Sequence, residues 1–165
     1  MAGERVTVSG LPDLRLALSS IPAKLRRRAL RNALAAGARV VQAAARARTP
    51  VLKTSTYSGG SAFRRGVRKP GTVRRAISVR TSKIARRAGD VGVFVNVRPA
   101  KAGQRGARNP GDPFYWRFIN FGTRRKTGAG FLQVGAARIG QALQVFIERI
   151  GPQIQKLNGG KGVEL

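Results

Sequence analysis

Between Pro22 and about Arg48, apolar residues recur at every third or fourth position, and most of them are alanine. This spacing predicts a long helix with one narrow apolar face. Because alanine has a small side chain, a sheet or a second helix can approach that face closely. Thr49-Pro50 should end the helix, since the residue before a proline is pushed out of the helical region. The face consists of Leu25, Ala29, Ala33, Ala36, Val40 and Ala44.

Shorter patterns predict the remaining elements of an α+β chain. They are a strand at 6–8, a short helix over 14–21, strands over 72–80 and 91–97, and a C-terminal helix that starts at 131. The alternating valines of the strand over 91–97 suggest that it pairs with the strand over 72–80 as a hairpin. We expect the segments 83–90 and 98–113 to be loops. Pro152 should kink or break the C-terminal helix.

The segment from 51 to 71 is rich in Gly, Ser and basic residues and has no sustained period. A connection of this length is normally functional or disordered. We predict one domain over residues 1–158, with this segment as a basic loop, and a flexible C-terminal tail over 159–165.

The charge of the chain is strongly unbalanced. It has 33 Lys and Arg against 6 Asp and Glu, which gives a net charge of +27. Residues 49–110 carry fifteen of the basic residues and one acid. Such a surface repels itself unless something neutralises it, so the charge predicts a polyanion or an acidic protein as partner. The side chains predicted to face nucleic acid or an acidic partner are Arg64, Arg65, Arg68, Lys69, Arg74, Arg75, Arg86 and Arg87.

The inventory of side chains disfavours an enzyme. The chain has no His and no Cys, and its six carboxylates are scattered along the sequence, so we interpret them as solvated or ion-paired acids. We predict no catalytic residue, no metal site and no cofactor. Neither the glycines of 66–71 nor those of 122–128 have the context of a phosphate-binding loop. No apolar run is long enough to span a membrane, and the first ten residues lack the order of a signal peptide.

Five of the ten aromatic residues lie within the eight positions 114–121, and Gly-Thr-Arg-Arg-Lys follows them directly. Such a segment could line a pocket, stack on nucleic-acid bases or pack at the edge of an assembling subunit.

The order of these patterns resembles one family. The residues concerned are Ala-Arg-Thr-Pro at 47–50, Gly-Thr-Val-Arg-Arg-Ala-Ile-Ser-Val at 71–79, the aromatic segment with Phe-Gly-Thr at 121–123, and Phe-Leu at 131–132. They resemble the phage tail-component family called HK-ninety-seven gp-ten-like, to which tail completion proteins such as the minor tail protein Z of phage lambda are related. Asn120 and Gly130 depart from the family pattern, in which a Glu and a Pro are common, and residues 51–70 look like an insertion.

The resemblance implies a long helix packed on a twisted antiparallel sheet, in a subunit that forms a ring, expected to be a hexamer. The ring would lie at the neck of the virion, around double-stranded DNA and against a tail terminator and a head-closure protein, after assembly in the host cytoplasm. The aromatic segment would then be a strand or loop at the subunit edge. Its predicted interface residues are Tyr115, Trp116, Phe118, Phe121, Gly122 and Thr123.

A second interpretation stays open at this stage. In a free nucleic-acid-binding protein of ribosomal or nucleoid type, Tyr115, Trp116 and Phe118 would stack on bases and the arginine-rich loops would follow the phosphates. This alternative explains the charge equally well. The oligomeric state separates the two, because a ring favours the neck protein and a monomer that binds RNA favours the alternative.

Overall fold

Helix α2 covers Ala23–Arg48 and confirms the long helix predicted from the spacing of small residues. The carbonyl of Pro22 accepts hydrogen bonds from the amides of Leu25 and Arg26 at its start. At its end, the hydroxyl of the buried Thr49 donates to the carbonyl of Ala45 at 2.7 Å. This bond satisfies a carbonyl of the last turn, and Pro50 then prevents the helix from continuing.

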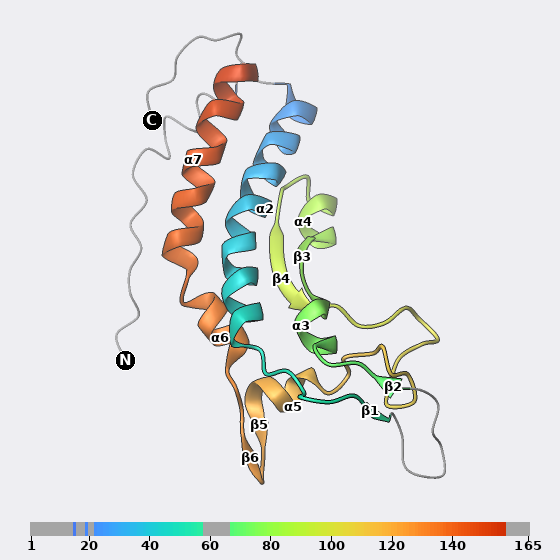
Figure 1. The fold of residues 1–165 in the computed structure, drawn as a ribbon. Helices are drawn as coiled ribbons and strands as arrows, with labels where there is room; N and C mark the ends of the chain where they lie inside the picture. The colour runs from blue at the N-terminus through green and yellow to red at the C-terminus, as the bar shows by residue number, and fades with distance from the viewer. Residues whose placement is uncertain (1–14, 16–18, 20–21, 58–66, 158–165) are drawn as a thin grey trace. The chain divides into compact units, whose positions relative to one another are not determined.

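The computed structural model describes residues 15, 19, 22–57 and 67–157 (Figure 1). The strand predicted at 6–8, the helix predicted over 14–21 apart from residues 15 and 19, and the tail over 159–165 lie outside the described residues. The chain divides into two units. Unit 1 takes the segments 1–39, 81–94 and 139–165, and unit 2 takes 40–80 and 95–138. The expectation of one domain stays a prediction.

In unit 1, the first part of α2 packs against α7, which covers Ile139–Leu157 (Figure 1). Ala29 and Ala33 form a buried cluster with Ile150 and Ile154. Nearer the other end of the pair, a Cβ added to Gly37 would lie 2.4 Å from the carbonyl oxygen of Ala142. The two helices therefore run antiparallel, and the small residues of α2 allow their close approach.

In unit 2, the end of α2 packs on β3, which covers Ile77–Thr81. The side chains of Gln42 and Arg46 both donate to the carbonyl of Ile77 at 2.8 Å. Ala45 packs with Ile77 in the core of the unit. The buried members of this core are Ala45, Val73, Ile77, Val97 and Phe131.

Three pairs of strands make up the sheets of the described chain. β3 pairs with β4, Val93–Val97, as the valine pattern predicted. β1, Thr56–Tyr57, pairs antiparallel with β2, Val67–Arg68, within the segment predicted to be a loop. β5, Gly122–Thr123, pairs antiparallel with β6, Lys126–Thr127. The α+β class and the C-terminal helix are thus confirmed.

Two predictions between 72 and 90 were wrong. The first half of the strand predicted over 72–80 is a helix, α3, over Thr72–Ala76, because Val73, Ala76 and Ile77 reach one core at helical spacing. The segment predicted to be a loop over 83–90 contains helix α4, Lys83–Arg87. The hydroxyl of Ser82 accepts a hydrogen bond from the amide of Ala85 at 3.2 Å and caps this helix.

The C-terminal helix is interrupted once, but not at its proline. α6 covers Phe131–Ala136, and a turn at 137–138 separates it from α7. Pro152 lies inside α7. Ile150 and Ile154 on either side of the proline are both 1% exposed, and their burial against α2 offsets the hydrogen bond that Pro152 cannot donate.

The contact at Gly37 predicts an unusual response to alanine. In Gly37→Ala the new methyl group would overlap the carbonyl of Ala142, so the change should destabilise unit 1 by about 1 to 3 kcal/mol although alanine favours helices. Gly140→Ala is the control, since nothing lies within 4 Å of its added Cβ, and it should be neutral or stabilising by up to about 1 kcal/mol. Thermal unfolding followed by circular dichroism compares the two. Equal melting temperatures would contradict the close contact.

Candidate functional site

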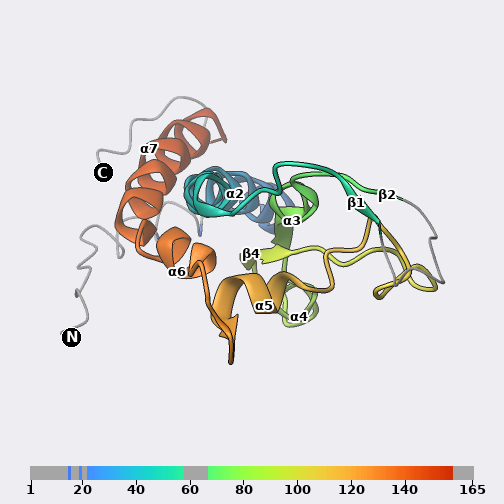
Figure 2. The same cartoon turned by 60° about the horizontal axis from the view of Figure 1, so that its bottom comes forward.

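The aromatic segment folds as a helix and not as the predicted strand or loop. α5 covers Trp116–Phe121, with Tyr115 at its N-cap, and the carbonyl of Pro113 accepts the amide of Trp116 at 2.9 Å (Figure 2). The helical spacing separates the rings into two faces. Tyr115 and Trp116 pack against the core of unit 2, whereas Phe118 and Phe121 are 60% and 66% exposed.

Asn120 holds the inner face of α5 in place. It is 1% exposed, and its Oδ1 accepts a hydrogen bond from the amide of Leu132 at 2.9 Å. Its backbone carbonyl accepts the amide of Gly130 at 3.0 Å. The sequence marked Asn120 only as a departure from a family pattern, but here the residue joins α5 to the start of α6.

A groove of about 660 Å³ lies beside α5 in unit 2. Its wall is mostly apolar, and the exposed ring of Phe118 forms part of it. Gly71 and Thr72 at the start of α3 also line it, as do Thr123, Lys126 and Thr127 of the β5–β6 hairpin. The aromatic groove, as we call it, has the apolar side chains Val51, Leu52, Val73, Phe114, Tyr115, Phe118 and Ile119 in its wall.

Arg68 lies inside unit 2, although the sequence predicted that it would face a polyanion. It is 8% exposed, and its guanidinium carbon lies 4.5 Å from the ring centre of Tyr115 and 5.3 Å from that of Phe114. Nη1 donates to the carbonyl of Asp112 at 3.2 Å and Nη2 donates to that of Asn109 at 3.5 Å. This guanidinium is therefore engaged by its own chain, and the expectation for Arg68 does not fit its position.

The β5–β6 hairpin follows α5 directly and depends on two glycines. Gly122 has a φ of 89°, and an added Cβ would lie 2.6 Å from the carbonyl oxygen of Lys126. A Cβ on Gly128 would lie 2.4 Å from the carbonyl oxygen of Asn120. The Phe-Gly-Thr motif therefore marks a turn that only glycine can make.

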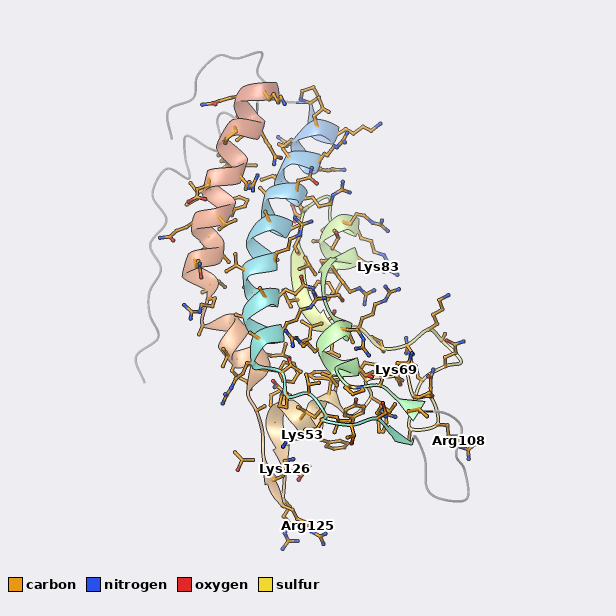
Figure 3. The ribbon with its side chains drawn as sticks, in the orientation of Figure 1. Lys53, Lys69, Lys83, Arg108, Arg125 and Lys126 are labelled. Carbon is orange, nitrogen blue, oxygen red and sulfur yellow. The ribbon has the colours of Figure 1, made fainter. Side chains whose placement is uncertain are left out.

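The tip of this hairpin is basic. Arg124 and Arg125 connect the two strands, Lys126 follows them, and all three side chains are exposed. Figure 3 places Arg125 at the outer end of the hairpin. In the sequence, Gly-Thr-Arg-Arg-Lys-Thr-Gly carries this signal, but the motif does not fit a phosphate-binding loop, and the sequence did not predict these three residues as part of a site.

One family model matches residues 13–122, two thirds of the chain, and its description is "Bacteriophage HK97-gp10, putative tail-component". The chain belongs to this family. It is a phage tail component, as the resemblance of its motifs suggested. The match begins before α2 and ends at Gly122, so the rest of the β5–β6 hairpin, α6 and α7 lie beyond it. No curated protein and no solved structure matches the chain.

The other basic residues predicted to meet a partner of this tail component are distributed over both units. Lys69 and Arg75 line a second hollow in unit 2, of about 460 Å³. Arg75 also donates from Nη1 to the carbonyl of Pro70 at 2.7 Å. Arg74 is exposed in α3, whereas Arg86 and Arg87 are exposed in α4 of unit 1. Arg64 and Arg65 lie outside the described residues.

Within the described residues, no three His, Cys, Asp or Glu side chains gather as metal ligands would. None of the described helices has the length and hydropathy needed to cross a membrane.

Arg68 and Lys69 provide a matched pair for testing the inner position of Arg68. Arg68→Ala should destabilise the protein by about 2 kcal/mol or more, because it removes charged hydrogen bonds and the contact with two rings. Lys69→Ala removes the same charge from an exposed side chain and should change stability by no more than about 0.5 kcal/mol. Urea unfolding of both variants gives the comparison. If Arg68→Ala is as stable as Lys69→Ala, Arg68 does not support the fold.

Proposed function

We propose that this tail component is a tail completion subunit that joins head and tail, and that copies of it form a hexameric ring at the neck around the DNA. The observation that carries the proposal is the outer face of α5. Phe118 and Phe121 are mostly exposed beside an apolar groove, in a chain with a net charge of +27. Clustered exposed rings of this kind are typical of protein interfaces.

A ring needs two different surface patches on each subunit, because every subunit contacts one neighbour with one patch and the next neighbour with the other. The rings of Phe118 and Phe121 in unit 2 are suited to be the first patch. Unit 1 exposes a large apolar side chain of its own, Ile84 of α4, which is 81% exposed. We assign the second patch to the surface around Ile84.

The charge of the chain supports the DNA-facing part of the proposal. Unit 2 contains nineteen Lys and Arg residues and one carboxylate, that of Asp112. Copies that form a ring with this composition repel one another unless anions lie between or inside them. DNA in the channel of the ring supplies those anions, and neighbouring neck and tail proteins close the ring on its two sides.

The two patches predict a specific result when a variant that lacks one patch is mixed with a variant that lacks the other. Phe118→Ser/Phe121→Ser and Ile84→Ser should each be monomeric, since every contact in the ring uses both patches. An equal mixture of the two variants should give dimers and nothing larger, because a single intact pair of patches remains. Native mass spectrometry measures these states. Ile147→Ser, which alters a half-exposed side chain of α7, is the control and should still form the ring.

Two results would contradict the proposal. A monomeric wild-type protein that binds RNA would favour the free nucleic-acid-binding protein instead. Dimers of either variant by itself would show that a patch contacts its own copy, and such a contact does not build the proposed head-to-tail ring.

A further inference from the structure

A small cationic hollow lies in unit 2, away from the residues that the sequence singled out. It has a volume of about 170 Å³, and its lining residues come from the end of β3 and from the loop that links β4 to α5. Four of its six lining residues carry a positive charge, and all four side chains are exposed. We call it the phosphate pocket, and its charged residues are Arg80, Arg98, Lys101 and Arg105.

The loop that carries three of these cations is held by a buried carboxylate. Asp112 is 2% exposed. Its Oδ1 accepts a hydrogen bond from the amide of Ala100 at 3.1 Å, and its Oδ2 accepts one from the amide of Gly106. These two hydrogen bonds fix the backbone just before Lys101 and just after Arg105. The backbone positions from which both side chains extend are therefore ordered.

Further hydrogen bonds shape the same loop. The amide of Arg98 donates to the carbonyl of Ala76 at 2.8 Å, which fixes the beginning of the loop beside β3. Nε of Arg105 donates to the carbonyl of Ala100 at 3.3 Å. This bond uses one donor of the guanidinium at the wall of the pocket, and the terminal nitrogens remain as further donors.

None of the six residues that line the phosphate pocket is acidic. Asp112 is the one acid in this unit, and both of its oxygens already accept backbone amides. Four cations around one hollow repel one another, and this repulsion lowers the stability of the empty arrangement. An anion bound between them would offset the repulsion.

We propose that this pocket binds one phosphate group of the backbone of double-stranded DNA. Three guanidinium groups and one ammonium group around a small hollow match the oxygens of a phosphate, to which arginine donates paired hydrogen bonds. The lining contains no aromatic side chain on which a base could stack. The contact is therefore independent of DNA sequence. This proposal rests on the DNA contact of the proposed function, but it does not require the ring.

The salt dependence of DNA binding tests whether the four cations together bind one phosphate. The wild-type full-length chain is compared with the variant Arg80→Gln, Arg98→Gln, Lys101→Gln and Arg105→Gln on duplexes of two different sequences. Because four cations share one phosphate, the variant should lose about 0.9 unit of the slope of log K against log salt. Four separate phosphate contacts would lose roughly 3.6 units. The loss should be the same on both duplexes.

A control variant removes the same charge from exposed positions in unit 1: Lys24→Gln, Arg28→Gln, Arg31→Gln and Lys156→Gln. An equal change in the slope of log K against log salt in both variants would overturn the proposed phosphate site, since the loss of total charge would then explain the change of slope. An unchanged slope in the pocket variant, with DNA binding retained, overturns the pocket and leaves the DNA contact standing. A wild-type chain that binds no DNA overturns both.

Asp112→Asn separates the shape of the pocket from its charge. The change raises the net charge by one, so electrostatics by itself predicts tighter DNA binding. It also places an amide NH₂ group against one of two backbone amides, which loosens the loop, and the phosphate pocket therefore predicts weaker binding. Asp90→Asn makes the same change of charge at an exposed position and should bind DNA at least as tightly as wild type. Tighter binding by a folded Asp112→Asn variant would overturn the proposal.

Discussion

Unit 2 has to fold around guanidinium groups almost without carboxylates, and backbone carbonyls take over the role that acids have in other proteins. The partly buried Arg46 donates to the carbonyl of Ile77, and the buried Arg68 donates to that of Asp112. A buried charge needs such partners, because leaving it without hydrogen bonds costs several kcal/mol. Carbonyls provide the bonds but not a countercharge. The unit therefore keeps nearly all of its positive charge after folding, and that charge has to be matched from outside.

Asp112 has an unusual role in this setting. As the one acid of unit 2, it would be expected to pair with a nearby arginine at the surface. Instead its carboxylate binds two backbone amides under a loop rich in glycine, proline and arginine. The negative charge is thus used to fix the shape of the loop. A buried carboxylate with fixed hydrogen bonds orders a loop that has little apolar surface of its own.

The sequence predicted the long elements well and the short ones poorly. α2 is specified over seven turns by its own spacing of alanines, and the valines of β4 specify a strand. α3, α4 and α5 have five or six residues each, and helices this short form only with a cap or a core contact. The apolar residues of 72–80 fit both the spacing of a helix and the alternation of a strand. Only the buried contacts of Val73 and Ile77 decide between a helix and a strand at the start of this segment.

The candidate surfaces were predictable in composition but not in detail. The aromatic segment was identified from the sequence, yet only the helical geometry of α5 shows that Trp116 faces inward while Phe118 and Phe121 face outward. The phosphate pocket could not be found, because Arg80 and Arg105 are distant in sequence and Asp112 looked like an ordinary solvated acid. A count of charges also cannot tell that Arg68 is enclosed by two rings.

The two proposed contacts depend on each other through charge. Copies of a chain with a net charge of +27 repel one another, and the apolar contact of two phenylalanine rings has to exceed that repulsion before a ring can close. At physiological salt, charges more than about 8 Å apart are largely screened, so the repulsion that matters comes from cations close to the contact. In the proposed ring, a phosphate bound in the pocket of each copy would neutralise part of its charge. DNA binding would then favour closure of the ring wherever the pocket lies near the contact, and by reciprocity the closed ring would hold DNA more tightly than a single subunit.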